Sequence, residues 1–392
     1  MSTQRQLFFQ HLALTSDFPL ALEISHAEGN YLIDVNGKKY LDLISGIAVS
    51  NLGHGHAKIK EAVIEQVNKN MHLMVYGEYV HSPQVKLAEK LCSLLPASLN
   101  NVYFVNSGAE AVEGALKLAK RFTGRTEIIS CKNAYHGSTH GALSIIGDEE
   151  FKNAFRPLLP DVRQIVFNDF SQLEQITGKT ACVIVEPVQG EAGIRPATKE
   201  YLEALRKKCT EQSVILIFDE IQSGYGRTGK LFAFEHYGVI PDVLLLAKGM
   251  GGGMPLGAFI SSQEMMKTLR TNPVLGHITT FGGHPVCCAA SLAALEEIVS
   301  PGIITTVTEK EKLFRQLLVH PAIREIRSKG LMMAVELESF EKVQQVITRC
   351  IEKGVIVDWF LFCNNSLRIA PPLTISEEEI RMACGVILES LN

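Results

Sequence analysis

Two residues that could perform chemistry follow short apolar segments. Asp219 comes directly after Leu216–Phe218, and Lys248 comes directly after Val243–Ala247. If both segments are buried parallel strands, an acid and an amine meet at the carboxyl edge of one sheet, where open α/β folds bind ligands. A partly buried lysine has a lowered pKa and becomes a nucleophile. The ordinary alternative is a solvated loop lysine beside an aspartate that caps a helix.

A third segment, Ser107-Gly108-Ala109, connects a predicted strand to a predicted helix. Backbone N–H groups at a helix N-terminus, together with a hydroxyl, form a ready site for a phosphate. The same residues also match a capping box, with Ser107 as the N-cap and Glu110 three residues later. The two interpretations are compatible, and the pattern alone does not favour the phosphate site.

Two further patterns resemble ligand sites. The run Gly224–Gly229 matches G-x-G-x-x-G, but five residues separate it from the preceding strand and no clear helix follows. Leu231 stands where a phosphate-binding P-loop needs serine or threonine for magnesium. His54 and His56 lie on a glycine-rich turn without an evident third metal ligand. We therefore expect neither a nucleotide site nor a metal site.

The bulk composition limits the class of protein. A chain of 392 residues predicts one large and one smaller domain, and 46% hydrophobic with 20% charged residues is typical of globular proteins. The net charge of −4 argues against a nucleic-acid-binding surface. No apolar run is long enough for a signal peptide or a membrane span. Nine cysteines without a C-x-x-C pair indicate a reducing, cytoplasmic location.

Short apolar runs alternate with helical patterns between residues 100 and 260, which predicts a mostly parallel α/β sheet. These runs have few polar positions, as expected for strands that helices cover on both faces. The predicted strands are Val102–Val105, Glu127–Ser130, Arg163–Phe167, Ala181–Val185, Val214–Phe218, Val243–Leu246 and Leu256–Ile260. Helices are expected at Ala109–Phe122, closed by Gly124, and at Thr198–Glu211.

Residues 285–392 predict a smaller α+β domain. Its helices are expected at Pro285–Val299, Thr308–Leu318, Phe340–Lys353 and from Glu377, and its strands at Leu331–Leu337, Val355–Asp358 and Leu367–Ala370. Near the N-terminus, Asn30–Val35 and Lys39–Leu43 predict a β-hairpin around Asn36-Gly37. We expect three parts: an N-terminal segment, residues 1–45, that packs with the small domain; a large domain, residues 46–284; and the small domain, residues 285–392.

Spaced motifs continue along nearly the whole chain. They are Asn106–Ala111, Ala134–Gly137, Val185–Glu191, Phe218–Lys230, Pro241-Asp242, Ala247–Ala258, Thr279–Gly283 and Leu367–Pro372. In this order they closely resemble the class III aminotransferases, above all the ornithine and N-acetylornithine aminotransferases. The resemblance implies fold type I of the pyridoxal-phosphate-dependent transferases, with a large α/β domain and a smaller α+β domain. It also implies pyridoxal 5'-phosphate as the cofactor and a homodimer as the assembly.

The same resemblance implies roles for the cofactor-site residues. Lys248 would bind pyridoxal phosphate covalently and later move the substrate proton, and Asp219 would keep the pyridine nitrogen protonated. The other residues of the cofactor site would be Ser107, Gly108 and Ala109 at the phosphate, Tyr135, His136 and Ile221 beside the ring, Gln222 near its phenolic oxygen, and Thr280 at the phosphate of the neighbouring subunit.

For the substrates, the resemblance implies that Arg368 clamps a carboxylate, a bidentate task suited to guanidinium. Glu191 would neutralise Arg368 while an ω-amino donor binds and swing aside for 2-oxoglutarate. The ordinary alternative for Arg368 is a structural ion pair. The chain departs from its relatives at Ser138, where they usually carry an arginine that binds the donor's distal carboxylate. A serine cannot replace a bidentate cation, so the identity of the donor stays open. A second departure is His284, which stands where relatives often have asparagine.

The sequence therefore predicts a ping-pong aminotransferase that passes an amino group from an ω-amino donor, such as ornithine or acetylornithine, to 2-oxoglutarate. One alternative is a class III transaminase for another donor (4-aminobutyrate, lysine or β-alanine), or a fold-related aminomutase. A second alternative is a cofactor-binding regulator without turnover, against which Lys248, Asp219 and Arg368 argue together. A third is a nucleotide-binding protein that uses Gly224–Gly229.

Overall fold

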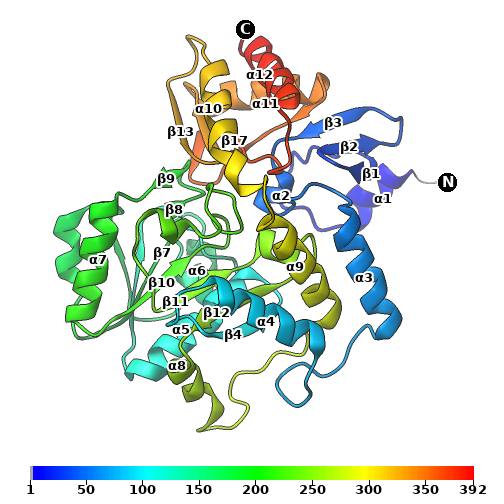
Figure 1. The fold of residues 1–392 in the computed structure, drawn as a ribbon. Helices are drawn as coiled ribbons and strands as arrows, with labels where there is room; N and C mark the ends of the chain where they lie inside the picture. Colours follow the sequence, from blue (N-terminus) through cyan, green and yellow to red (C-terminus); the bar gives the residue numbers. More distant parts are fainter. Residues whose placement is uncertain (1–2) are drawn as a thin grey trace.

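Seven short strands form the central sheet of the chain (Figure 1). The computed structural model describes residues 3–392. In spatial order the strands are β4 (Asn101–Val105), β12 (Gly257–Ser261), β11 (Val243–Leu246), β10 (Ile215–Asp219), β7 (Thr180–Val185), β5 (Glu127–Cys131) and β6 (Val162–Ile165). Every adjacent pair from β11 to β6 is parallel, and β12 runs antiparallel to both of its neighbours. The predicted mostly parallel sheet is confirmed.

Helices cover both faces of this sheet. They are α4 (Ser82–Leu94), α7 (Lys199–Glu211) and α9 (Pro285–Ile298) on one face, and α5 (Gly108–Thr123) and α8 (Gln263–Lys267) on the other. Along β10, Leu216 and Phe218 pack into the first core, whereas Ile215 and Ile217 pack into the core beneath α5. Because side chains alternate across a strand, a strand that is apolar at every position needs cover on both faces.

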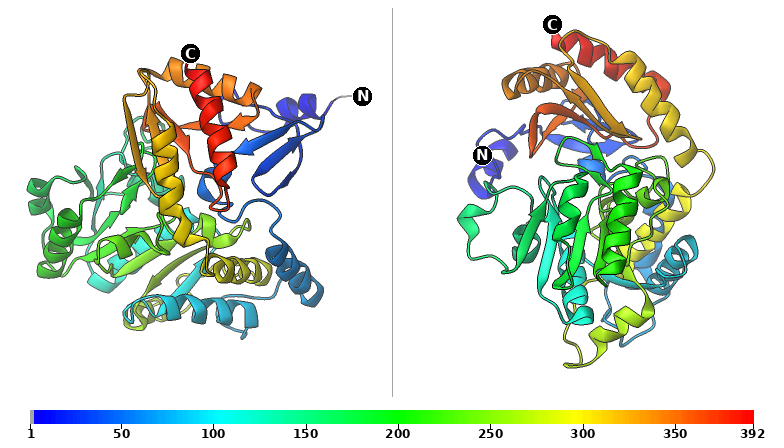
Figure 2. Two further views of the ribbon diagram at one scale, coloured as in Figure 1. Left: turned by 45° about the horizontal axis from the view of Figure 1, so that its top comes forward. Right: turned by 90° about the vertical axis from the view of Figure 1, so that its left-hand side faces the viewer.

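A second sheet and its helices lie at one end of the large domain (Figures 1 and 2). In spatial order its strands are β13 (Glu325–Lys329), β14 (Met332–Glu336), β17 (Cys363–Ile369) and β16 (Asp358–Phe360), and all neighbours are antiparallel. The helices are α10 (Val307–Leu317), α11 (Phe340–Glu352) and α12 (Glu377–Leu391), which share one apolar core with the sheet. The predicted small α+β domain is confirmed. Strand β13 was not predicted, because three of its five residues are charged.

The N-terminal strands join this end of the molecule. They are β1 (Ile24–Glu28), β2 (Tyr31–Asp34) and β3 (Lys39–Asp42), paired antiparallel as the predicted hairpin requires. Strand β15 (Val355–Ile356) lies parallel to β3, and Leu41 N donates to Gly354 O at 2.8 Å. The domain boundaries at residues 45 and 284 stay a prediction.

The predicted strand Val355–Asp358 is wrong in one respect, because it consists of two strands in different sheets. Val355 pairs with Leu41 in the N-terminal sheet, whereas Asp358 pairs with Arg368 in the small-domain sheet. An apolar run predicts a strand but does not predict its partner, so a change of sheet within the run is invisible in the sequence.

The remaining helices are shorter or lie at the edges of the domains. They are α1 (Gln4–His11), α2 (Ser45–Ala48), α3 (Ala57–Lys69) and α6 (His140–Ser144). None of the helices between residues 3 and 392 has the length and apolar character needed to cross a lipid bilayer.

The glycine-rich run Gly224–Gly229 forms turns around a buried arginine. Arg227 is fully buried, and burial lowers its pKa to about 9. Its guanidinium donates to Asn51 Oδ1 at 2.5 Å, to Leu331 O at 3.2 Å and to the carbonyl of Pro371. These acceptors come from three separate parts of the chain, two of them in the small domain. The motif therefore connects the domains through one cation.

Candidate active site

The carboxyl edge of the central sheet opens into a cavity of about 500 Å³, a volume typical of small-molecule sites. Strands β10 and β11 are adjacent, and this brings Asp219 and Lys248 to the same edge. Ten of the twelve predicted site residues line this cavity. They are Ser107, Gly108, Ala109, Tyr135, His136, Glu191, Asp219, Ile221, Gln222 and Lys248. The two predicted residues outside the cavity wall are Thr280 and Arg368.

Lys248 begins a short 3-10 turn directly after β11. Its φ of 47° is unusual for a residue with a side chain, and such backbone strain of roughly 1–3 kcal/mol is found mainly at functional sites. Burial lowers the pKa of the ammonium, while the nearby carboxylates of Glu191 and Asp219 oppose this shift. A lowered pKa makes an amine more nucleophilic, which fits the role that the sequence predicts for Lys248.

Asp219 forms a buried pair with His136. His136 Nδ1 lies 2.7 Å from Asp219 Oδ2, and the backbone N–H of Ile221 donates to Asp219 Oδ1 at 3.0 Å. Both side chains of the pair are nearly inaccessible to solvent. The other ring nitrogen of His136 is buried without a hydrogen-bond partner in residues 3–392. The carboxylate is thus held in one orientation at the cavity wall.

The N-terminus of α5 points its first N–H groups toward the cavity wall. Ser107 is the N-cap, and its hydroxyl accepts the N–H of Glu110 at 3.2 Å. The predicted capping box is only half formed, because the Glu110 carboxylate accepts the N–H of Asn106 rather than that of Ser107. A Cβ on Gly108 would lie 2.8 Å from Ile221 Cδ1, so only glycine permits this close packing. The helix N-terminus and the hydroxyl together suit a phosphate.

Arg368 lies behind Glu191 and is buried, with 4% of its surface exposed. Its Nη2 donates to Glu191 Oε2 at 2.7 Å and to Trp359 O at 2.9 Å, and its Nε lies 3.2 Å from Asp358 Oδ1. Its Nη1 is buried without a hydrogen-bond partner in the part of the chain that the structure describes. Burial raises the pKa of Asp358 to about 6, although Arg368 opposes this shift. If Glu191 moved away, the guanidinium would present free donors to a carboxylate.

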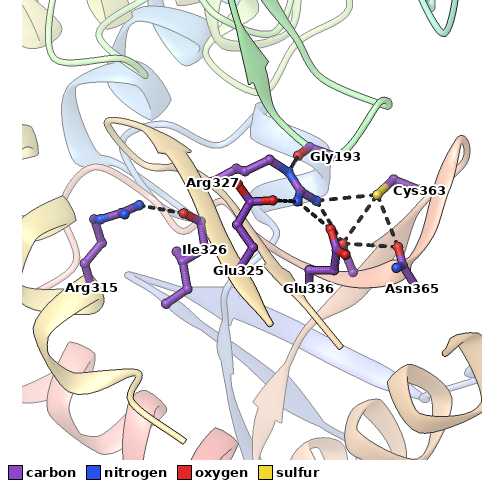
Figure 3. A network of polar contacts seen from close by, with 9 residues as sticks. Gly193, Arg315, Glu325, Ile326, Arg327, Glu336, Cys363 and Asn365 are labelled. Atoms are coloured by element: carbon purple, nitrogen blue, oxygen red, sulfur yellow. Dashed lines mark hydrogen bonds and ion pairs between the residues drawn. The ribbon is translucent and has the colours of Figure 1, made fainter. Parts of the chain in front are cut away.

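Glu191 stands at the tip of a small hairpin of β8 (Val188–Gln189) and β9 (Arg195–Pro196). We call its tip, Gly190–Gly193, the gate turn. The gate turn contacts the small domain at both Glu191 and Gly193. Leu361 N donates to the Glu191 carboxylate at 3.1 Å. Arg327 Nε donates to Gly193 O at 2.7 Å (Figure 3).

Thr280 is exposed and does not line the cavity of its own chain. The segments around it carry exposed apolar side chains. These are Met71, Leu73, Tyr79, Val80 and Val85 on one segment, and Val274, Leu275, Ile278 and Phe281 on the other. We call them the apolar patch.

Glu186 is a site residue that sequence reasoning missed. It follows β7 directly, as Asp219 ends the adjacent strand β10, and it lines the same cavity. Burial and the neighbouring Asp219 raise its pKa to about 7, while His136 opposes this shift. The signal that identified Asp219, an acid at the end of a buried strand, also applied to Glu186.

His54 and His56 belong to separate pairs. His54 Nε2 lies 2.9 Å from Asp42 Oδ2, and His56 Nε2 lies 3.7 Å from Glu297 Oε2. Residues 3–392 contain no group of three or more His, Cys, Asp or Glu side chains suited to hold a metal ion. The cavity instead combines a buried carboxylate, an amine with a lowered pKa and a helix N-terminus. This donor set fits pyridoxal phosphate.

Comparisons with known proteins point to one family. The family described as aminotransferase class-III matches residues 14–391. The acetylornithine aminotransferase of Methanocaldococcus jannaschii is 41% identical over 94% of this chain and 93% of its own, and that of Bacillus subtilis is 38% identical over 94% and 95%. The ornithine aminotransferase of Toxoplasma gondii has a similar structure, with a TM-score of 0.92 and 29% identity over 100% of this chain and 95% of its own. A transaminase from the marine bacterium Virgibacillus gives a TM-score of 0.93 and 28% identity over 99% and 98%.

Proposed function

This chain belongs to the class III aminotransferases, whose cofactor is pyridoxal phosphate, and from that premise we propose that it transfers an amino group from an ω-amino donor to 2-oxoglutarate. Relatives named acetylornithine aminotransferase make acetylornithine and ornithine the first donors to test. The observation that carries the proposal is the Glu191–Arg368 pair at 2.7 Å beside Lys248, because it offers one site to two unlike substrates.

In this proposal each group has a defined role. Bound pyridoxal phosphate supplies a carbonyl that bonds amines and a ring that accepts electrons. Lys248 provides the amine that holds the cofactor and the base that moves the substrate proton. Asp219, fixed by His136, keeps a proton on the pyridine nitrogen through a charge-assisted hydrogen bond. Ser107 and the N-terminus of α5 bind the phosphate.

The other residues complete the cofactor site and the substrate site. Tyr135 and Ile221 pack against the ring, and Gln222 approaches its phenolic oxygen. Glu191 covers Arg368 while the donor's amine reacts and leaves it when 2-oxoglutarate brings a carboxylate. Alternating these two states gives a ping-pong reaction, with release of an aldehyde or oxoacid before the acceptor binds.

A donor screen tests this function. The enzyme loaded with pyridoxal phosphate is incubated with 2-oxoglutarate and acetylornithine, ornithine, lysine, 4-aminobutyrate or β-alanine, and glutamate is measured. At least one ω-amino donor is expected to give glutamate. Turnover of donors without glutamate would instead favour an aminomutase or a decarboxylase, and no reaction with any donor would favour a regulator.

Arg368→Lys is expected to raise the KM for 2-oxoglutarate roughly 10- to 100-fold, because a lysine cannot form the bidentate bond to a carboxylate. The KM for the amino donor should change much less, since in the proposed function Arg368 is paired with Glu191 while the donor binds. Steady-state kinetics with each substrate varied in turn measure both constants. The control is Arg349→Lys, an exposed arginine of the small domain. An unchanged KM for 2-oxoglutarate would exclude Arg368 as the clamp.

We also propose that the chain forms a homodimer. The apolar patch is suited to a second copy of this chain, since exposed apolar groups gathered on neighbouring segments usually mark an interface. Thr280 lies within one of these segments and would reach the phosphate of the neighbouring cofactor.

Val80→Glu is expected to convert the dimer to monomers, because Val80 is 92% exposed in the single chain and a buried unpaired carboxylate is strongly unfavourable. Sedimentation velocity measures the mass of the particle. The matched control is Val319→Glu, since Val319 is 74% exposed on the small domain and this variant should stay dimeric. Thr280→Val should stay dimeric and bind pyridoxal phosphate more weakly. A monomeric wild type would refute the assembly.

The expectation of a cytoplasmic location also stays a proposal. It is supported by nine cysteines, none of which forms a disulfide.

A further inference from the structure

Glu186 connects two loops that face the cavity. Its Oε1 accepts the backbone N–H of Tyr135 at 3.1 Å, and its Oε2 accepts the backbone N–H of Gly190 at 2.9 Å. Tyr135 belongs to the loop that packs against the cofactor ring, and Gly190 begins the gate turn. The side chain is 6% exposed, so water does not compete effectively for these two bonds. One carboxylate therefore fixes the distance between the two loops.

The position of Glu186 in the sheet is as rigid as that of Asp219. Val185 pairs with Phe218 in adjacent parallel strands, so the two carboxylates extend from neighbouring positions of one sheet edge. Burial beside a like charge is unfavourable for a carboxylate, and it is retained only where specific hydrogen bonds compensate. For Glu186 these bonds come from the two loops.

The gate turn is held at its other end by the small domain. Arg327 Nε donates to Gly193 O at 2.7 Å, and the same guanidinium bonds Glu336, Glu325 and Ser366 (Figure 3). Glu191 lies between Glu186 on the large-domain side and Arg327 on the small-domain side, and its own backbone carbonyl accepts the N–H of Phe362 at 3.1 Å. Its side chain can therefore leave Arg368 only by rotating on a fixed backbone.

The side chain of Gln222 packs against Gly190, the first residue of the gate turn. A Cβ on Gly190 would lie 2.2 Å from Gln222 Oε1, which means that the Gln222 side chain packs directly on the Gly190 Cα. Gly190 does not have a positive φ, so this close contact, and not the backbone conformation, is what requires glycine at this position.

The geometry points to Glu186 as a positioning residue that holds the gate turn in register with the cofactor-facing loop, so that Glu191 competes effectively for Arg368. This inference rests on the proposed function, in which Glu191 and the acceptor's carboxylate compete for that arginine. Arg368 itself is held by Trp359 O and Asp358, independently of the gate turn. Loosening the turn is therefore expected to weaken the competitor and leave the clamp intact.

Glu186→Gln tests this role. A glutamine side chain has one oxygen acceptor and one NH2 donor, so it can accept only one of the two backbone N–H groups. We expect the loss of one of these bonds to weaken the pairing of Glu191 with Arg368. A carboxylate ligand should then bind Arg368 roughly 5- to 30-fold more tightly. The enzyme loaded with pyridoxal phosphate is titrated with glutarate, a dicarboxylate that cannot react. Trp359 reports binding by fluorescence, since it is the single tryptophan and its carbonyl contacts Arg368. The kcat/KM for the ω-amino donor should fall in the same variant.

Glu220→Gln is the matched control. Glu220 is also a buried carboxylate at the end of β10 that accepts two backbone N–H groups, from Ala233 and Phe234, but it does not line the cavity. If the two buried carboxylates only stabilise the fold, both variants should lose kcat/KM for the donor to the same extent. Neither variant should then bind glutarate more tightly than wild type. Tighter glutarate binding in Glu186→Gln alone supports the inference, and unchanged or weaker binding overturns it.

Two further variants keep the test decisive. If Glu186→Gln does not fold, Glu186→Asp keeps the carboxylate but is one methylene shorter, so it cannot reach both backbone N–H groups and must give the same tighter binding; normal affinity in that variant overturns the inference. Arg368→Lys separates the inference from the function on which it rests. If glutarate changes the Trp359 fluorescence of wild type but not that of Arg368→Lys, Arg368 is supported as the carboxylate clamp. This conclusion does not depend on the result for Glu186→Gln. If wild type itself does not respond, the clamp and the inference both fail.

Discussion

Lys248→Ala is expected to lower glutamate formation by roughly 10⁴-fold or more, because one side chain performs two tasks. In the proposed function its amine holds the cofactor covalently, and the same amine later moves the substrate proton. Positioned proton transfer alone contributes about 10²- to 10⁴-fold. The loss should appear in kcat, since the residues that bind the phosphate and the carboxylate remain in place.

Two measurements check this result. Glutamate formation gives the rate, and borohydride reduction followed by mass spectrometry shows whether the cofactor is attached to the chain. The control is Lys152→Ala, which removes another buried lysine, one that pairs with Glu149 at 2.8 Å outside the cavity wall. It should keep the attached cofactor. Normal turnover by Lys248→Ala would refute the catalytic assignment.

Arg227→Met is expected to produce the largest loss of stability. Methionine has a similar length but leaves Asn51 Oδ1 and the carbonyls of Leu331 and Pro371 without their donor. Each buried acceptor that loses its partner costs about 1–3 kcal/mol, so the free energy of unfolding should fall by roughly 3 kcal/mol or more. Since these contacts connect the two domains, the domains are also expected to unfold less cooperatively.

Urea unfolding followed by Trp359 fluorescence and by circular dichroism measures both effects. Arg156→Met is the control, because that arginine is half exposed and pairs only with an exposed glutamate, a contact worth at most about 1 kcal/mol. If Arg227→Met and Arg156→Met unfold at the same urea concentration, the buried guanidinium does not stabilise the domain connection.

The large sheet and most of its helices were predictable, because strands covered on both faces leave a continuous apolar signal. The segment Val243–Leu246 and the helix closed by Gly124 illustrate this, and Gly124 indeed adopts a left-handed φ of 68°. Helices α3 and α4 were not predicted. Each contains only two buried residues, although α3 is as amphipathic as the predicted helix α7.

The site was predictable where a polar residue interrupts or ends an apolar run, as at Asp219 and Lys248. It was not predictable where function depends on contacts between distant segments. Arg227 stands among glycines and resembles a solvated loop residue, but it is fully buried because acceptors come from three remote parts of the chain. Glu186 carried the right signal, but its two backbone partners exist only in the folded chain.

The pairing of β3 with β15 joins residues near the two ends of the chain, and it has a consequence for synthesis. Leu43 N donates to Ile356 O at 3.0 Å, and Ala370 N donates to Leu43 O at 2.6 Å. The N-terminal hairpin leaves the ribosome long before β15 and cannot complete its sheet until residues 355–356 have emerged. Contacts of such long sequence separation form late. Because Arg368 lies in the same late segment, a nascent chain that has already built the large sheet still lacks the arginine proposed as its substrate clamp.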